Sequence, residues 1–246
     1  MLTRANLQKF TDHTQTTLEN VIREYCQHLF LSYLYQLPDA EHLLFKGGTA
    51  LRIVFHSPRF SEDLDFTGVK ITQHKVEELF VNTLANIEKT GIPVVLKEGK
   101  YTTGGYLGIF EFSAYDKITE IYFEVSLRND NRISRMSGIR TLIENDYIQP
   151  YTLVHLPKEE IIKGKMQALI NRHKPRDFYD YFFLLSGNYP LVKEKDNLTQ
   201  VLALLKKTKI NFRNEIKELL PASHTMHLRN FNKVLEQKIL SFLDKK

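Results

Sequence analysis

The spacing of hydrophobic residues changes twice along the chain, and these changes limit the folds that the chain can adopt. Residues 17–37 carry apolar side chains at three- and four-residue steps, which predicts a helix. From about residue 40 to residue 155, short runs of alternating polar and apolar residues predict strands that are separated by turns and helices. Beyond Pro157 the spacing is helical again.

These patterns predict an α/β (α+β) fold with two parts. We expect N-terminal helices and a strand-containing core in residues 1–155, and a helical C-terminal domain in residues 156–246. A linker is expected at 149–157, which holds two prolines. The expected strands are 63–67, 92–97, 105–112 and 119–126. The further expected helices are 50–55, 73–90, 157–172, 175–185, 197–220 and 227–243.

Composition excludes several classes of protein. No apolar run reaches the roughly 18 residues of a membrane helix, and the N-terminal residues do not resemble a signal peptide. A single cysteine, Cys26, excludes an internal disulfide and fits a reducing compartment. We therefore expect a cytoplasmic protein without a membrane partner. The formal net charge of +5 is consistent with a polyanionic partner and equally with an ordinary solvated surface.

Asp63 and Asp65 are the first candidate functional residues. Side chains two positions apart on a strand project from the same face, so both carboxylates point the same way. Two adjacent carboxylates repel each other unless they share a divalent cation such as Mg²⁺ or Mn²⁺. The alternative is a solvated acidic pair at the protein surface.

A glycine turn lies upstream of this pair. Gly47 and Gly48 separate an apolar segment from a predicted helix that begins at Thr49, its expected N-cap. Backbone N–H groups and a hydroxyl would converge there, as in a site that binds phosphate. Together with the carboxylates, this turn predicts a nucleoside triphosphate site, although the chain contains no P-loop or dinucleotide motif. The glycines are also explained by the conformation of a tight turn alone.

A third carboxylate comes from the strand expected at 119–126. Glu124 faces away from Ile121, Phe123 and Val125, so it would complete a metal triad beside the aspartates. It would also accept the proton of an attacking hydroxyl. Glu120 lies on the same strand face and competes for this role, but its place at the end of the strand favours solvation.

Cationic and acidic residues of the C-terminal half supply further candidates. Lys165 lies in an apolar helical stripe, where it either contacts a phosphate or extends its ammonium group to solvent. Asp177, in the first turn of the next helix, is explained by the helix dipole or by a role in fixing Lys165 or a nucleotide. After the Glu124 strand, several arginines suit either a triphosphate or RNA backbone or a solvated loop. They are Arg128, Arg132, Arg135 and Arg140.

Four motifs resemble the AbiEii/AbiGii toxin family of the polymerase-beta-like nucleotidyltransferase superfamily. They are FKGGTALR at residues 45–52, SPRFSEDLDF at 57–66, EIIKGKMQAL at 160–169 and RHKPRDFYD at 172–180. The resemblance implies a nucleotidyltransferase-type mixed sheet flanked by helices, with a helical C-terminal part. It also implies Mg²⁺, a nucleoside triphosphate and a toxin–antitoxin setting with a cognate antitoxin protein. In characterised relatives the acceptor is the 3′ end of tRNA.

With this resemblance, we expect a nucleotidyltransferase that adds nucleotides to RNA, most simply tRNA, and releases pyrophosphate. Asp63, Asp65 and Glu124 would bind the metal, and Gly48 and Thr49 the phosphates. The other expected nucleotide-binding residues are Lys46, Gly47, Arg59, Ser61 and Lys165. Lys165 and Arg59 would stabilise developing charge, and Asp177 matches the last acidic motif of the family. The alternatives are transfer onto a protein side chain and a nucleotide-binding regulator without turnover.

Overall fold

The computed structural model describes residues 2–127, 136–187, 189–208 and 211–244. The chain forms two compact units. The first consists of Met1–His56 and Phe60–Pro157, and the second of Ser57–Arg59 and Lys158–Lys246. The short segment Ser57–Arg59 therefore belongs with the C-terminal helices, although the residues on both sides of it belong to the first unit.

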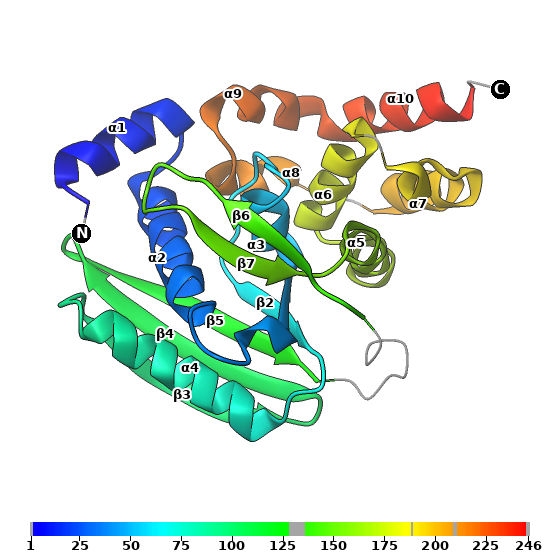
Figure 1. Ribbon diagram of the computed structural model, residues 1–246. Coiled ribbons are helices and arrows are strands. Elements are labelled where there is room, and N and C mark those ends of the chain that lie inside the picture. The colour runs from blue at the N-terminus through cyan, green and yellow to red at the C-terminus, as the bar shows by residue number, and fades with distance from the viewer. Residues whose placement is uncertain (1, 128–135, 188, 209–210, 245–246) are drawn as a thin grey trace. The chain divides into compact units, whose positions relative to one another are not determined.

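The described residues of the first unit form one seven-stranded mixed sheet with helices (Figure 1). Its strands are β1 (Leu43–Lys46), β2 (Leu64–Gly68), β3 (Val94–Thr102), β4 (Gly105–Ala114), β5 (Lys117–Ser126), β6 (Ile139–Ile143) and β7 (Tyr151–His155). Its helices are α1 (Arg4–Thr14), α2 (Leu18–Leu34), the 3₁₀ turn η1 (Ala40–His42), α3 (Gly47–Ile53) and α4 (Gln73–Glu88).

The strand order places β1 and β2 in the middle of the sheet. The order is β3-β4-β5-β2-β1-β7-β6. β2 runs antiparallel to β1 and parallel to β5, while β1 runs parallel to β7. The remaining neighbouring pairs are antiparallel. The end of β1 therefore lies beside the start of β2, which in turn lies beside the second half of β5.

Aromatic side chains join one face of the sheet to α2 and α4. Phe30 of α2 stacks on Phe110 of β4 with ring centroids 4.7 Å apart, and Phe80 of α4 stacks on Phe123 of β5 at 4.9 Å. All four rings are fully buried. Because strand residues alternate between faces, the neighbours of Phe123 on β5 project from the opposite face. Glu124 is one of them.

The described residues of the second unit are helical. Helices α5 (Lys158–Arg172) and α6 (Pro175–Ser186) pack against each other and are followed by shorter elements. These are η3 (Pro190–Lys193), α7 (Lys195–Lys207), α8 (Phe212–Ile216), η4 (Lys217–Leu219), α9 (Ala222–Thr225), η5 (Met226–Asn230) and α10 (Phe231–Leu243). Within the described ranges, no helix has the length and apolar character needed to cross a bilayer.

The mixed α/β fold and the helical C-terminal region confirm the predicted fold class. The expected linker at 149–157 is wrong, because Tyr151–His155 forms β7 between β1 and β6. Strand β6 was also not predicted. The helix expected at 197–220 is divided, since α7 ends at Lys207 and α8 begins at Phe212.

Candidate functional site

Three charged side chains lie in one row across the middle of the sheet. Lys46, the last residue of β1, is paired with Asp65 of β2, and Asp65 is paired with Glu124 of β5. Paired residues on neighbouring strands project from the same face, and the strands lie about 4.8 Å apart. The expectation that Glu124 lies beside the aspartate strand is confirmed by this register. Asp63, two positions before Asp65, directly precedes β2.

Lys46 extends along this face toward the end of β5. Its ammonium group lies 3.3 Å from the hydroxyl oxygen of Ser126, two residues after Glu124 on the same strand face. The lysine therefore supplies a positive charge beside Asp65 and Glu124. Lys46, Asp63 and Asp65 are each half-buried, whereas Glu124 is exposed, so the row is open to a ligand at the Glu124 end.

The glycine turn touches the row directly. Gly47 has a φ of +83°, in the left-handed region where side chains are disfavoured. A side chain at position 47 would overlap the carboxylate of Asp65. Glycine is therefore required at this position both for its backbone conformation and for the space that the carboxylate occupies.

The structure assigns Thr49 a different contact from the expected one. Helix α3 begins at Gly47, so Thr49 is not its N-cap, and the residue is fully buried. Its hydroxyl donates a hydrogen bond to the backbone carbonyl of Asp63. This hydrogen bond connects the glycine turn to the aspartate segment. Because the hydroxyl is buried and already donates to a carbonyl, it does not make the expected contact with a phosphate. Gly48 is also buried, and Ser61 is half-buried.

The donor atoms of this row suit a hard divalent cation. Carboxylate oxygens are the ligands that Mg²⁺ prefers, and Mg²⁺ binds through one or two carboxylates together with substrate phosphates. Adjacent register positions bring Asp65 and Glu124 within one strand spacing, and the missing side chain at Gly47 leaves the space that the Asp65 carboxylate occupies. Among the described residues, no three His, Cys, Asp or Glu side chains converge on a single metal position. The residues present therefore fit a cation held by two carboxylates more closely than the expected preformed triad.

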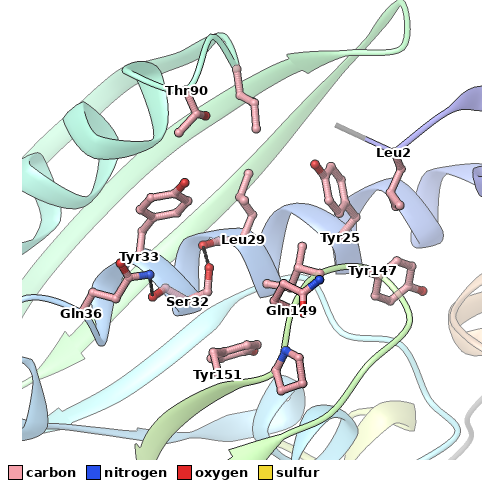
Figure 2. Close-up of a pocket in the computed structure, with 13 residues that line it drawn as sticks. Leu2, Tyr25, Leu29, Ser32, Tyr33, Gln36, Thr90, Tyr147, Gln149 and Tyr151 are labelled. Carbon is pink, nitrogen blue, oxygen red and sulfur yellow. Dashed lines mark hydrogen bonds between the residues drawn. The ribbon is translucent and has the colours of Figure 1, made fainter.

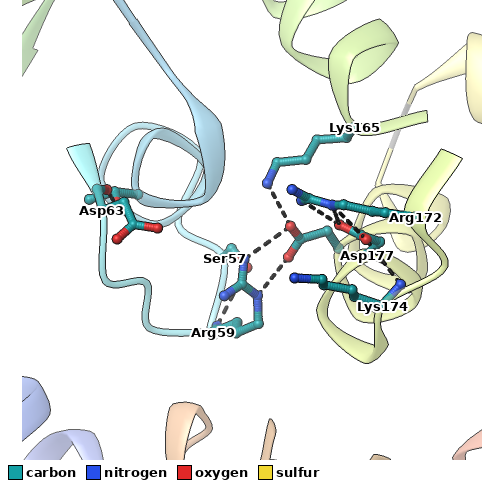
Figure 3. Close-up of polar contacts among 9 residues, drawn as sticks. Ser57, Arg59, Asp63, Lys165, Arg172, Lys174 and Asp177 are labelled. Atoms are coloured by element: carbon teal, nitrogen blue, oxygen red, sulfur yellow. Dashed lines mark hydrogen bonds and ion pairs between the residues drawn. The ribbon is translucent and has the colours of Figure 1, made fainter. Parts of the chain in front are cut away.

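A second charged cluster lies within the C-terminal unit (Figure 3). Arg59 donates from Nε and Nη2 to the two carboxylate oxygens of Asp180, at 2.7 and 3.0 Å. Lys165 of α5 donates to the same carboxylate at 2.7 Å. Burial acts to raise the pKa of Asp180, but Arg59 and Lys165 outweigh it and lower this pKa to about 2. The cluster therefore carries two positive charges and one negative charge.

This cluster corrects two expectations. The side chain of Arg59 is only 3% exposed and is paired with Asp180. Its guanidinium is therefore not placed to make the expected contact with a phosphate. Lys165 is held by Asp180 rather than by Asp177. Asp177 instead receives hydrogen bonds from the guanidinium of Arg172, at 2.7 to 3.1 Å, and from the backbone N–H of Lys174. It thus caps the start of α6, as its place in the first turn also suggested.

A separate cavity of about 520 Å³ lies against α2 (Figure 2). Tyr25, Tyr33, Tyr147 and Tyr151 line it together with aliphatic and uncharged polar residues. No charged side chain lines it among the described residues. A triphosphate needs nearby cations, so the row that contains Lys46 is the better candidate for a nucleotide site.

The arginines expected to contact RNA or phosphate, Arg128, Arg132 and Arg135, lie outside the described residues. Arg140 is an exposed residue of β6.

Comparison with known proteins identifies the family. The profile of the AbiEii family, described as nucleotidyl transferase AbiEii toxins of type IV toxin–antitoxin systems, matches residues 29–245. This chain belongs to the AbiEii family. It is therefore a nucleotidyltransferase of a type IV toxin–antitoxin system, an enzyme class that uses a nucleoside triphosphate. Among curated proteins, none matches the chain in sequence.

Solved structures share the fold of this AbiEii protein. The nucleotidyltransferase toxin MenT4 of Mycobacterium tuberculosis superimposes with a TM-score of 0.67 at 17% identity, covering 100% of this chain and 91% of MenT4. The structure of JHP933 from Helicobacter pylori gives a TM-score of 0.54 at 20% identity, covering 92% and 95%. At these identities the likeness shows the fold alone.

Sequence reasoning missed two residues of these clusters. Asp180 was present in the RHKPRDFYD motif, and its position three residues after Asp177 was a usable signal, since both lie on one side of α6. Ser126 lies on the same strand face as Glu124, and only the strand order, with β2 between β1 and β5, shows that the Lys46 side chain can reach it.

Proposed function

We propose that this AbiEii protein catalyses Mg²⁺-dependent transfer of a nucleotide from a nucleoside triphosphate to the 3′ end of an RNA, most simply a tRNA. The observation that carries the proposal is the row of Lys46, Asp65 and Glu124 beside the turn at Gly47. Carboxylates next to a cation and a glycine turn are the groups that a metal–triphosphate complex requires. A cognate antitoxin, which the family implies, is the proposed protein partner.

Binding of the triphosphate is divided between two sets of groups. Asp65 and Glu124, with Asp63 adjacent, would hold Mg²⁺, which when bound neutralises charge on the triphosphate. Backbone N–H groups at Gly47 and Gly48 would donate to phosphate oxygens. The ammonium group of Lys46 adds a positive charge on the same face.

Glu124 is the proposed general base. Its carboxylate is exposed at the open end of the row and would accept the proton of the acceptor 3′ hydroxyl. The hydroxyl oxygen then bonds to the α-phosphorus while the bond from that phosphorus to the bridging oxygen breaks, and pyrophosphate leaves. Most of the rate acceleration would come from positioning and charge neutralisation.

The C-terminal unit holds a charged cluster of its own, which is a second candidate for binding an anion. The cluster of Arg59, Lys165 and Asp180 keeps one net positive charge, which would attract an anionic group such as a phosphate to this unit. Asp177 is proposed to act through the geometry of α6 rather than on the nucleotide, since Arg172 holds it.

The proposal is tested by incubating the protein with Mg²⁺, each α-labelled nucleoside triphosphate and total tRNA. Label that enters ribonuclease-sensitive material supports transfer to RNA. Label in protease-sensitive material identifies a protein acceptor and overturns the RNA assignment. Tight nucleotide binding without transfer to either acceptor contradicts the proposed reaction.

Variants of the row test the residue roles. We expect Asp65→Ala to abolish transfer while the circular dichroism spectrum stays unchanged, because the residue is half-buried outside the aromatic core. Glu124→Gln should also abolish transfer. Glu120→Gln is the matched control, since Glu120 lies on the same face of β5 and pairs with Glu111 rather than Asp65. Retained activity in Asp65→Ala removes the metal assignment.

A further inference from the structure

The segment that leads into the aspartate strand has no regular secondary structure, yet its backbone is held by side chains. Residues 60–63 belong to neither a helix nor a strand. The backbone carbonyls of Ser61, Glu62 and Asp63 all accept hydrogen bonds from side chains of the first unit. Carbonyls in irregular segments can bind water instead, whereas these three consecutive carbonyls are held by two protein side chains.

Gln27 supplies two of these hydrogen bonds. Its side chain is on α2, and the residue is only 1% exposed. The Nε2 amide group donates to the carbonyl oxygens of both Ser61 and Glu62, at 3.0 Å each. An amide nitrogen has two hydrogens, so the two bonds use its full donor capacity. Thr49 then holds the next carbonyl, that of Asp63.

Arg52 holds the same segment from α3. Its guanidinium lies over the ring of Phe60, 3.9 Å from the ring centroid. Arg52 also donates to both carboxylate oxygens of Glu24, at 2.6 and 3.2 Å. Glu24 precedes Gln27 by three positions on α2, so both residues project from one side of this helix. Helix α2 therefore fixes the segment directly through Gln27 and indirectly through Glu24 and Arg52.

We infer that Gln27 is a positioning residue that sets the location of the Asp63 and Asp65 carboxylates. Gln27 lies outside the motifs of the glycine turn and the aspartates. The effect of Gln27 on activity rests on the proposed function. Groups that orient metal ligands commonly change metal affinity or activity by about 10- to 100-fold when they are replaced. Gln27 acts one step further away, through the backbone that carries the ligands, so we expect a change near tenfold.

The test replaces Gln27 by methionine, which keeps the length of the side chain and removes both donors. We expect Gln27→Met to weaken binding of Mn²⁺ to the full chain about tenfold, measured by the electron paramagnetic resonance signal of free Mn²⁺. We also expect faster hydrogen exchange at the amides of Leu64 and Asp65. Asn20→Ala is the matched control, because Asn20 is a buried amide of α2 that donates to Thr16.

The outcomes separate the positioning role from the proposed reaction. If both variants lose thermal stability but only Gln27→Met changes Mn²⁺ affinity and exchange at Leu64 and Asp65, the positioning role is supported. If exchange at these amides is the same in Gln27→Met as in wild type, the inference is overturned even when the enzyme is active. If wild type neither binds Mn²⁺ nor transfers nucleotide, the proposed function fails, and the exchange result still decides the role of Gln27. Gln27→Asn, which shortens the side chain by one methylene, replaces the methionine variant if that one does not fold.

Discussion

At the scale of single residues, the site depends on how closely a backbone and a carboxylate approach each other. Gly47 combines a left-handed φ with contact against Asp65, whereas Gly91 has a similar φ of +79° and no neighbour within 4 Å of a Cβ position. The two glycines therefore differ in their surroundings but share the same conformational demand. Substituting each glycine in turn therefore distinguishes the effect of backbone strain from the effect of displacing Asp65.

We predict that Gly47→Ala abolishes nucleotide transfer and lowers the free energy of unfolding by about 1–3 kcal/mol, because the added methyl group displaces Asp65. Gly91→Ala should cost about 1–2 kcal/mol through its φ alone and keep full activity. Denaturant unfolding and the labelled-nucleotide assay measure both effects. Equal loss of activity in the two variants would show that the contact with Asp65 has no role.

Sequence analysis located Asp65 and Glu124 because their positions follow from alternation along a strand. Glu124 could be assigned to the polar face of its strand because its neighbours are apolar, and the register with Asp65 agrees. Arg59 and Thr49 could not be assigned from pattern alone. Arg59 meets Asp180, which is 121 positions away, and Thr49 meets a backbone carbonyl, and neither partner leaves a periodic signal.

At the scale of elements, the pair of helices α5 and α6 is joined by charge as well as by apolar packing. Lys165 of α5 and Arg59 of the segment Ser57–Arg59 share the carboxylate of Asp180 on α6. A buried charge that loses its partners is costly, so this carboxylate matters for the stability of the second unit.

We predict that Asp180→Asn lowers the free energy of unfolding by about 3–5 kcal/mol at pH 7, because two cations lose their partner. The pKa of Asp180 is about 2 in the folded protein against 3.8 ordinarily, so its stabilisation is present above pH 3.8 and is lost as the pH falls toward 2. This difference between the folded and unfolded pKa corresponds to about 2 kcal/mol of the free energy of unfolding. Denaturant unfolding between pH 7 and pH 2 measures it, with the exposed Asp196→Asn as a control for loss of a carboxylate.

If the difference between wild type and Asp180→Asn stays constant below pH 4, the charged cluster is not the source of that stability.

The strands and helices that sequence analysis found or missed show what periodicity can predict. β4 and β5 have long alternating runs, and their predicted positions agree with the structure to within a few residues. β7 was missed because it is five residues long and lies between two prolines. Its run of Tyr, Thr, Leu, Val and His was a usable signal, since aromatic and β-branched residues favour strands.

At the scale of the whole molecule, the two units contain buried titratable groups that respond to different ranges of pH. In the first unit, burial lowers the pKa of His28 to about 4, and its Nδ1 atom lies 2.9 Å from the hydroxyl oxygen of Tyr151. A histidine that is neutral when folded binds a proton more readily when unfolded. Its stabilising effect is therefore complete above about pH 6.5 and is lost as the pH falls toward 4.

We predict that acidification from pH 7 to pH 4 lowers the free energy of unfolding of the first unit by about 3 kcal/mol, because His28 binds a proton more readily in the unfolded chain. His28→Gln should make the free energy of unfolding less dependent on pH over this range, and His13→Gln, an exposed histidine of α1, controls for removal of a histidine. Hydrogen exchange in core strands of the first unit measures the effect separately from the second unit. An unchanged dependence on pH in His28→Gln would exclude this histidine as its source.

The central claim is that one face of the sheet, at Asp65 and Glu124 beside the turn at Gly47, holds the divalent cation and the triphosphate. The most direct measurement is a crystal structure of the protein with Mn²⁺ and a non-hydrolysable nucleoside triphosphate, using anomalous scattering to locate the metal. We expect an anomalous peak within coordination distance of Asp65 and Glu124, with phosphate oxygens next to the backbone of Gly47 and Gly48. A nucleotide and metal bound elsewhere, with both carboxylates unliganded, would contradict the account.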